Sequence, residues 1–244
     1  VQTCALPIYE EFDNPQIIFH LAATARLGVS LKDPAGVMKN NFDSTLRVLE
    51  YCRAHPETKL IFISSSSVKH ADLTKNPYAL SKQIGEELVR MYVGTYHIEA
   101  VSVRFFNVYG PGEADYGANT TLLKKCKQKI MTGQDFHING KGDILRDFTH
   151  VDDVVSGLLA VMDEMVTGFS IPLYELGNGN PETVLNVVKA FQEGTNLKIE
   201  FRASRPGDAP KTSANLGIRP RFWEAKINVL DYIREWKAAG SPND

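Results

Sequence analysis

Short apolar runs alternate with segments of helical periodicity over the first half of the chain. The runs PQIIFHLAA, KLIFISSSSV and EAVSVRFFNV are apolar along most of their length, which predicts strands buried on both faces. Between them, residues 37–53 and 76–97 carry apolar side chains at helical spacing. Strands and helices in this alternation predict a parallel sheet with helices on both sides, in which ligands bind at the carboxyl ends of the strands.

The pattern becomes looser after Gly112. Helical spacing predicts four further helices, at residues 120–131, 154–162, 183–192 and 227–236. Short apolar segments predict strands in DFHI, RDFTHV, LYELG and KIEF. We expect these elements to form a smaller mixed α/β region that caps the sheet. Because the sequence has no internal repeat and no obvious flexible linker, we expect two lobes to form one interleaved unit.

Composition limits the class of protein. The chain has 244 residues, of which 43% are hydrophobic and 23% charged, which is typical of a globular domain. A formal net charge of -2 gives no electrostatic reason to expect nucleic acid or an anionic membrane as a partner. Three scattered cysteines without a C-x-x-C argue against a disulfide framework or a zinc site. No apolar run predicts a transmembrane helix or signal peptide, so we expect a cytoplasmic protein without a metal.

Candidate chemistry begins with a serine run and a tyrosine-lysine pair. The serines end a predicted strand, so at least one hydroxyl should point into the crevice above the sheet. Tyr78 and Lys82 lie one helical turn apart, on the same side of a predicted helix. A lysine ammonium beside a phenol lowers the pKa of the phenol, so Tyr78 could act as a general acid or base, with a serine sharing the proton. The structural alternative is a packed tyrosine beside a solvated lysine.

The stretch RDFTHVDD, residues 146–153, allows two interpretations. Asp152 or Asp153 could cap a helix N-terminus and complement its dipole. Arg146 could instead reach a phosphate group, because its planar fork matches phosphate oxygens. The stretch alone leaves both interpretations open, and Asp147 has no assigned role.

The order of these motifs resembles that of a known family. HLAA, the serine strand end, Tyr-x-x-x-Lys, RFFNVYGPG and RDFTHVDDVV follow one another as in the extended short-chain dehydrogenase/reductase family, specifically its NAD-dependent nucleotide-sugar epimerases and dehydratases. The resemblance runs from about Glu10 to the C-terminus and includes RPGDAPKTSANLG. It implies a Rossmann-type doubly wound parallel sheet and NAD as the cofactor. Residues 1–112 would form a partial NAD-binding domain, and residues 113–244 mainly a nucleotide-sugar binding region interleaved with it.

The resemblance also implies roles for individual residues. Ser65 would be the catalytic hydroxyl, Tyr78 the base, and Lys82 the residue that holds the nicotinamide ribose. The implied cofactor-binding residues are Ala22, Ala23, Asn41, Ser64, Tyr78, Lys82 and Phe105. The residues implied to hold the nucleotide diphosphate of the substrate are Asn107, Thr121, Leu122, Arg146, Arg205 and Asp208. This interpretation favours the phosphate-binding role for Arg146 and leaves Asp152 and Asp153 as cap and structure.

The sequence departs from the family pattern in several places, of which two bear most on the site. The family has a strand and a glycine-rich turn for the NAD pyrophosphate before the segment that matches IIFHLAA, and no G-x-x-G-x-x-G occurs in this sequence. We therefore interpret the chain as an N-terminally incomplete member that lacks the first strands of the sheet. The usual VYG after the serines is Val68, Lys69 and His70 here. We expect Lys69 and His70 on a loop surface, with contact to the hexose as the alternative.

The implied reaction is epimerisation, most often at C4 of a UDP-hexose, through a transient keto sugar. A dehydratase of the family carries an Asp-Glu pair directly after the catalytic hydroxyl, and a decarboxylase a glutamate, whereas Ser66 and Ser67 stand there in this chain. The competing hypotheses are a truncated, non-catalytic domain and a reductase of a small carbonyl compound, for which Arg146 and Arg205 would have no phosphate to bind. The family resemblance further implies a homodimer formed through the helices at 37–53 and 78–96.

Overall fold

The fold comes from a computed structural model that describes residues 14–25, 27–114, 120–204 and 209–240. Contacts divide the chain into two compact units. The first contains the chain up to Arg104 together with Leu159–Glu175, and the second contains Phe105–Leu158 and the chain from Leu176 onward. The division thus falls eight residues before the boundary expected at residue 112, and a segment of the C-terminal half belongs to the first unit.

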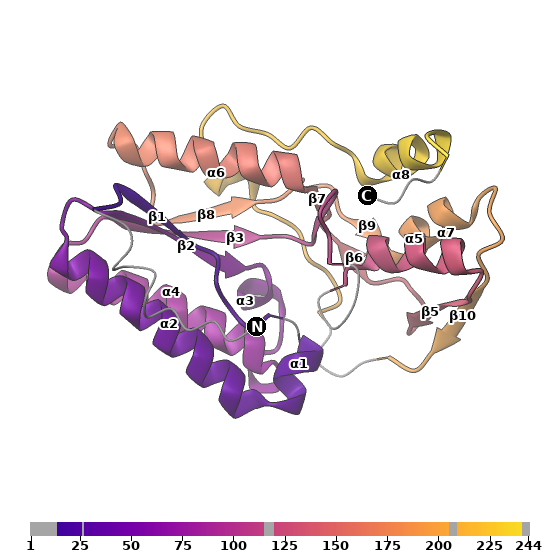
Figure 1. The fold of residues 1–244 in the computed structure, drawn as a ribbon, viewed down its shortest axis with the longest axis horizontal. Helices are drawn as coiled ribbons and strands as arrows, with labels where there is room; N and C mark the ends of the chain where they lie inside the picture. The colour runs from indigo at the N-terminus through magenta and orange to yellow at the C-terminus, as the bar shows by residue number, and fades with distance from the viewer. Residues whose placement is uncertain (1–13, 26, 115–119, 205–208, 241–244) are drawn as a thin grey trace. The chain divides into compact units, whose positions relative to one another are not determined.

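The first unit is built on a four-stranded sheet. Its strands are β1 (Ile17–His20), β2 (Lys59–Ser65), β3 (Ala100–Phe105) and β8 (Leu173–Leu176), in the order β1-β2-β3-β8. The strands β1 and β2 pair in parallel, with Ile17 opposite Lys59. The strands β1, β2 and β3 confirm the prediction that the three apolar runs form strands. The segment LYELG was expected in the capping region and instead forms the fourth strand, because it pairs with β3 (Figure 1).

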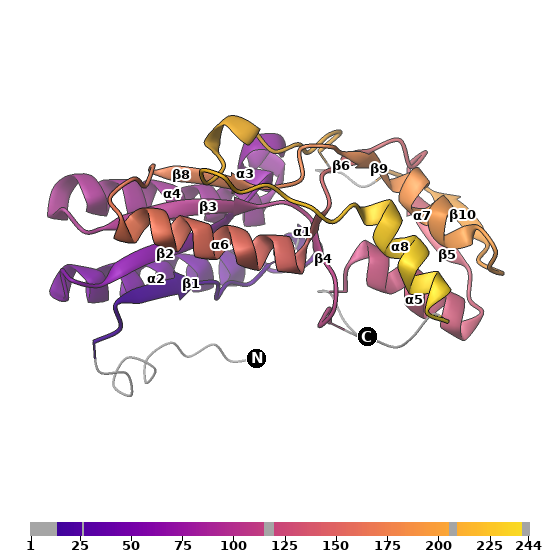
Figure 2. The same ribbon diagram turned by 90° about the horizontal axis from the view of Figure 1, so that it is seen from above.

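Two long helices cover one face of this sheet. They are α2 (Pro34–Ala54) and α4 (Pro77–Tyr96), which pack against each other and against β2. Both begin in the same way: Asp33 and Asn76 accept a hydrogen bond from an N–H of the first turn, and a proline follows each cap. The opposite face is covered by the part of α6 (Val151–Val166) that belongs to the first unit (Figures 1 and 2). The core between β2, α2 and α4 contains Val48, Leu49, Cys52, Leu60, Phe62, Val89, Tyr92 and Ile98.

Two short helices were not expected from the sequence. The helix α1 spans Leu27–Lys32, and α3 spans Ser67–His70. The serine run is therefore only partly strand: β2 ends at Ser65, and the carbonyl of Ser66 accepts the N–H groups of Lys69 and His70. The expectation that Lys69 and His70 lie on a loop was wrong, because both residues form the last turn of α3.

The second unit combines helices with short strand pairs. Its helices α5 (Leu122–Thr132), α7 (Val184–Gln192) and α8 (Val229–Ala238) pack around a core that includes Tyr109, Phe148, Phe191 and Trp236. The strand β5 (Phe136–Asn139) pairs in parallel with β10 (Ile199–Arg202). Two shorter pairs join β4 (Val108–Tyr109) to β7 (Thr149–His150), and β6 (Leu145–Arg146) to β9 (Glu182–Thr183). Helix α6 follows β7 without a loop and is longer at both ends than predicted.

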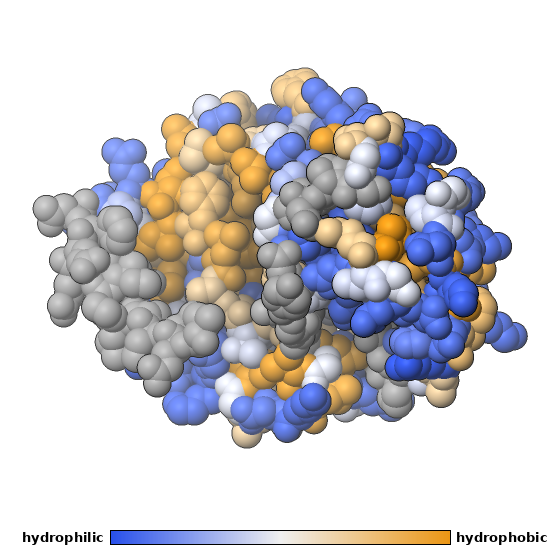
Figure 3. Space-filling view, turned by 45° about the vertical axis from the view of Figure 1, so that its right-hand side comes forward, coloured by the Kyte–Doolittle hydropathy of each residue, from blue (hydrophilic) through white to orange (hydrophobic). Residues whose placement is uncertain are grey.

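Apolar side chains also reach the surface. Figure 3 shows hydrophobic residues gathered in patches on the face that it displays. On α6, Val155, Leu159 and Val166 are about half exposed or more, and on α4 the exposed apolar residues include Met91 and Tyr96. Within the described ranges, no helix is both long enough and apolar enough to cross a membrane.

Two glycines of α4 test how tightly this helix packs on β2. A Cβ added at Gly85 would lie 2.4 Å from Cζ of Phe62, whereas one at Gly94 would meet nothing within 4 Å. We expect Gly85→Ala to lower the free energy of unfolding by about 1–3 kcal/mol through overpacking. Gly94→Ala should raise it by roughly 0.5–1 kcal/mol, because alanine is the better helix former. Denaturant unfolding of both variants measures this, and shifts of the same sign would contradict the packing.

Candidate active site

The most unusual charge in the first unit is the ammonium group of Lys82. The side chain is buried, and its Nζ donates to the carbonyl oxygen of Ile63 at 2.7 Å and lies 5.1 Å from the ring centroid of Phe62. Burial lowers the pKa of Lys82 to about 8, against the opposing charge of Glu86. Among the described residues, Ile63 is the only hydrogen-bond partner of this ammonium. The solvated lysine of the structural alternative is thereby excluded, and two N–H groups remain for a ligand.

Tyr78 lies in the first turn of the same helix. It is half-buried and stands one turn before Lys82, so the two side chains leave α4 on the same side, as the sequence predicted. Its backbone carbonyl accepts the hydroxyl of Ser81 at 2.8 Å. The cap at Asn76 and the proline after it fix where the helix begins, and with it the position of Tyr78.

The two serines at the end of β2 have different environments. Ser64 is buried, and its hydroxyl donates to Glu86 at 2.5 Å. Ser65 is half-buried, its hydroxyl lies 3.1 Å from that of Ser67, and its oxygen accepts the N–H of Ser67 at 3.2 Å. Ser65 is thus the more accessible hydroxyl at the carboxyl end of the strand. Its catalytic role remains a prediction.

Asn41 joins the loop after β1 to α4. Its side-chain oxygen accepts the N–H of Thr24 at 2.7 Å, while its amide nitrogen donates to the carbonyl of Thr24 at 3.0 Å and to the hydroxyl of Ser81 at 2.9 Å. Ala22, which is exposed, and Ala23, which is half-buried, lie in the loop that is held in this way. Asn41 therefore joins the loop with Ala22 and Ala23 to the turn of α4 that contains Tyr78 and Lys82.

His20, the last residue of β1, lies close to this junction. Its Nε2 is 3.2 Å from the hydroxyl of Thr45. Burial, and then the positive charge of Lys82, lower the pKa of His20 to about 4. The imidazole is therefore neutral at pH 7, and the positive charge of Lys82 contributes to this.

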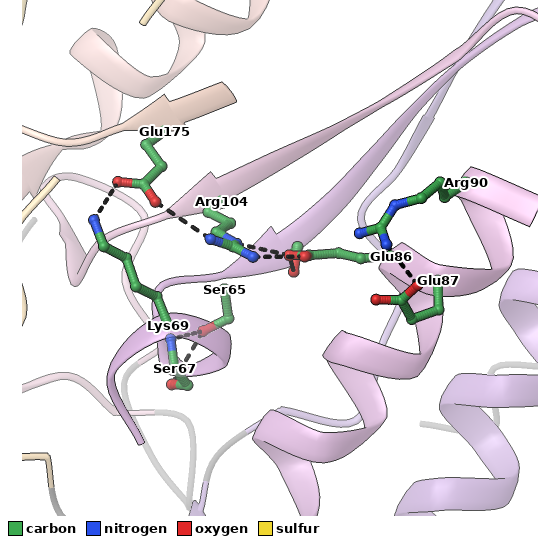
Figure 4. Close-up of polar contacts among 9 residues, drawn as sticks. Ser65, Ser67, Lys69, Glu86, Glu87, Arg90, Arg104 and Glu175 are labelled. Atoms are coloured by element: carbon green, nitrogen blue, oxygen red, sulfur yellow. Dashed lines mark hydrogen bonds and ion pairs between the residues drawn. The ribbon is translucent and has the colours of Figure 1, made fainter. Parts of the chain in front are cut away.

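An ion network crosses the sheet behind the serines (Figure 4). Arg104 on β3 donates two hydrogen bonds to Glu86, at 2.8 and 2.7 Å, and contacts Glu175 on β8 at 3.4 Å. The Glu86 carboxylate raises the pKa of Arg104 further. Glu175 is nearly fully buried and also pairs with Lys69 at 3.1 Å. We did not predict this network from the sequence, although a charged residue within each of two otherwise apolar strands was a signal for it.

The second unit contains most of the residues predicted to bind the substrate. The side-chain amide of Asn107 donates to the carbonyl of Asp147 at 3.0 Å and to the hydroxyl of Thr212 at 3.2 Å. Thr121 caps α5, donates to the carboxylate of Glu113, and is followed by Leu122 as the first helical residue. Phe105 ends β3 and is half-buried.

Arg146 is held by the backbone near a predicted binding segment. Its Nη1 donates to the carbonyl oxygens of Leu145 at 3.0 Å and of Ala209 at 2.7 Å. Arg205 and Asp208 lie outside the described residues. A phosphate ligand for Arg146 therefore remains a prediction.

Asp147, which the sequence left without a role, connects three segments of the second unit. Its fully buried carboxylate accepts the backbone N–H groups of Asn178 at 2.8 Å, Gly179 at 2.9 Å and Ala214 at 2.8 Å. Its own N–H donates to the hydroxyl of Thr212 at 3.1 Å, the same hydroxyl that Asn107 contacts. Asp147 thus holds together the segments on which Asn107 and Arg146 lie.

The two aspartates that follow have separate roles. Both lie in the first turn of α6, where a negative charge is favourable. Asp153 is buried and accepts the N–H of Ile227 at 3.0 Å, so it also joins α6 to the chain before α8. Asp152 is exposed, with its carboxylate 3.6 Å from Nδ1 of His150.

Comparison with known proteins identifies relatives of the chain. Residues 5–177 match the model of the NAD dependent epimerase/dehydratase family. The chain is 29% identical over 236 residues to the uncharacterized protein MJ1055 of Methanocaldococcus jannaschii, covering 90% of this chain and 70% of that protein. It is 29% identical over 233 residues to UDP-glucuronate 4-epimerase 4 of Arabidopsis thaliana, covering 84% of this chain and 52% of that protein. The chain thus spans about half the length of this plant relative.

Two similar solved structures contain a UDP-sugar. The UDP-glucose 4-epimerase of Thermotoga maritima, with UDP-glucose, aligns with a TM-score of 0.79 at 25% identity, covering 93% of this chain and 79% of that one. The UDP-glucuronic acid 4-epimerase of Bacillus cereus, in complex with UDP-glucuronic acid and NAD, aligns with a TM-score of 0.78 at 25% identity, covering 90% and 73%.

We expect Asp147→Asn to destabilise the second unit strongly. The asparagine side chain has one acceptor oxygen, and its NH2 group would face at least one of the three backbone donors. Each buried N–H that loses its acceptor costs about 1–3 kcal/mol. Asp152→Asn is the matched control, since Asp152 is exposed, and it should change the free energy of unfolding by less than about 0.5 kcal/mol. Denaturant unfolding gives both values, and equal effects would contradict the role of Asp147.

Proposed function

The chain belongs to the NAD dependent epimerase/dehydratase family, as its motifs predicted, and on that basis we propose that it carries out the epimerisation of a nucleotide sugar, at C4 of a UDP-hexose, through a transient keto sugar. The proposed activity requires a glycine-rich strand-turn-helix that binds the NAD pyrophosphate. The 244-residue sequence does not contain this element. The observation that carries the proposal is the buried Lys82 ammonium, one turn from Tyr78 and at the carboxyl end of the strand that bears Ser65.

The residues of the first unit fit a nicotinamide cofactor. A buried ammonium with a single protein acceptor is suited to hold a ribose hydroxyl, and its charge favours the phenolate of Tyr78. Tyr78 takes the proton from the sugar hydroxyl, and Ser65 shares it on the same oxygen. Bound in this place, NAD would supply the hydride acceptor, and in its reduced form the hydride donor, for the carbon that carries this oxygen. Ala22, Ala23, Asn41, Ser64 and Phe105 are the remaining proposed cofactor residues.

The residues of the second unit would hold the nucleotide end of the substrate. We assign this role to Asn107, Thr121, Leu122 and Arg146, and also to Arg205 and Asp208. Binding through the nucleotide supplies affinity while the hexose stays free to turn over between the two hydride transfers. The choice of a UDP-hexose is supported by relatives that are named UDP-glucuronate 4-epimerases and UDP-glucose 4-epimerase.

The local structure after Ser65 favours epimerisation over dehydration. A dehydratase needs an acid and a base directly after the catalytic hydroxyl. In this chain Ser66 occupies the N-cap of α3, and Ser67 exchanges hydrogen bonds with Ser65. Neither side chain can remove water from the sugar by acid-base chemistry near pH 7.

We also propose that the protein forms a homodimer through α2 and α4. The side of α4 with Val89 and Tyr92 is buried in the core, which leaves the stripe with Leu80 and Met91 exposed. Phe42 adds an exposed aromatic ring on α2. Analytical ultracentrifugation should give twice the mass of one chain, and Met91→Glu should shift the protein to the monomer. A monomeric wild-type protein would contradict this proposal.

The activity is tested with a protein that contains this chain preceded by the proposed glycine-rich segment. We expect it to interconvert C4 epimers of UDP-glucose or UDP-glucuronate, as followed by proton NMR of the sugar. Tyr78→Phe should lower kcat by about 10²–10⁴-fold, because it removes the general acid-base group. The control Tyr51→Phe, on α2, should leave kcat unchanged. A product that is only a 4-keto-6-deoxy sugar, or no turnover with either sugar, would overturn the proposal.

A further inference from the structure

Lys69 makes an ionic contact that its place in the chain does not suggest. It lies on α3, the four-residue helix that follows Ser65, in the place where the family pattern usually has a tyrosine. Its ammonium group is 3.1 Å from Oε2 of Glu175, whose side chain is 1% exposed, while the Lys69 side chain itself is 35% exposed. The partly exposed side chain of Lys69 thus pairs with the buried carboxylate of Glu175 on β8.

The contact completes the ion network behind the serines. Glu175 is shared by Lys69 and Arg104, and Arg104 also forms two hydrogen bonds to Glu86 (Figure 4). Glu86 accepts the hydroxyl of Ser64. Lys69 and Arg104 thus pair with the carboxylates of Glu175 and Glu86. Loss of Lys69 would remove one of the cations that pair with the nearly fully buried Glu175, which is unfavourable.

Helix α3 needs a tertiary contact of this kind. A helix of four residues is not stable by itself. Its N-cap, Ser66, makes no side-chain cap hydrogen bond, and none of its residues is buried. Ser67, its first residue, donates its N–H to Oγ of Ser65. This hydrogen bond links the first residue of α3 to the hydroxyl of Ser65.

We propose that Lys69 is a positioning residue: by pairing with Glu175 it fixes α3 against β8 and so orients the hydroxyl of Ser65 for proton sharing with the sugar. This inference rests on the proposed function only through the role of Ser65. The sequence left contact between Lys69 and the hexose as an alternative. In this proposal the ammonium of Lys69 pairs with Glu175 instead, and the residue affects the reaction through Ser65.

Hydrogen exchange of the 244-residue chain tests the structural part. Lys69→Met should speed exchange of the amides of residues 67–71 about five- to tenfold, because the contact that closes this segment is lost. Exchange in the middle of α4 should not change, which reports that the fold is intact. Lys69→Arg should restore slow exchange, and Glu175→Gln should reproduce the loss. The matched control is Lys75→Met, because Lys75 pairs with Asp72 in an exposed place. Unchanged exchange in Lys69→Met would overturn the proposal.

Kinetics of the upstream-extended protein test the positioning part. Lys69→Met should lower kcat about ten- to a hundredfold with little change in KM, since a displaced hydroxyl affects the reacting oxygen and not the nucleotide. In a Ser65→Ala background the same substitution should have no further effect on kcat. Faster exchange with an unchanged kcat, or an equal loss of kcat in both backgrounds, would overturn the positioning role. Absence of turnover in the wild type would instead contradict the proposed function. The hydrogen-exchange result would still test whether the contact between Lys69 and Glu175 holds α3 in place.

Discussion

The first unit depends on one buried cation. The ammonium of Lys82 lies under the carboxyl end of β2, bonded to the carbonyl of Ile63 and packed over Phe62. Because this hydrogen bond joins α4 to β2, it fixes the position of the helix along the strand and, with it, the position of Tyr78. The pKa of Lys82 is lowered to about 8, so the folded state binds this proton more weakly than the unfolded chain does. Its burial therefore costs stability at pH 7, and this cost falls as the pH rises above 8.

Polar groups elsewhere in the structure are satisfied in two different ways. In the first unit, Glu86 and Glu175 are balanced by cations across the sheet, which suits a place where strands and helices meet closely. In the second unit, the carboxylate of Asp147 is surrounded by backbone N–H groups from segments that would otherwise leave donors unpaired. Each arrangement holds in place segments that carry proposed binding or catalytic residues. Stability and function are therefore linked through the same few charged side chains.

The sequence predicted the elements with strong periodicity and missed those that depend on distant partners. The apolar runs gave β1, β2 and β3, and helical spacing gave α2 and α4. Helices α1 and α3 are too short to show a period. The strand β8 was placed in the wrong region, because an apolar run does not reveal its neighbour in a sheet. The role of Asp147 could not be read locally, since its partners lie 31 to 67 residues away. The pair Tyr78 and Lys82 was predictable because one helical turn joins them.

The burial of Lys82 is tested most directly by a nuclear magnetic resonance titration of its side chain, assigned by comparison with Lys82→Met. We expect a midpoint near pH 8, because the ammonium is buried against β2. A midpoint near the ordinary value of 10.5 would show that the side chain is solvated and would contradict the placement of Tyr78 and Ser65 around it.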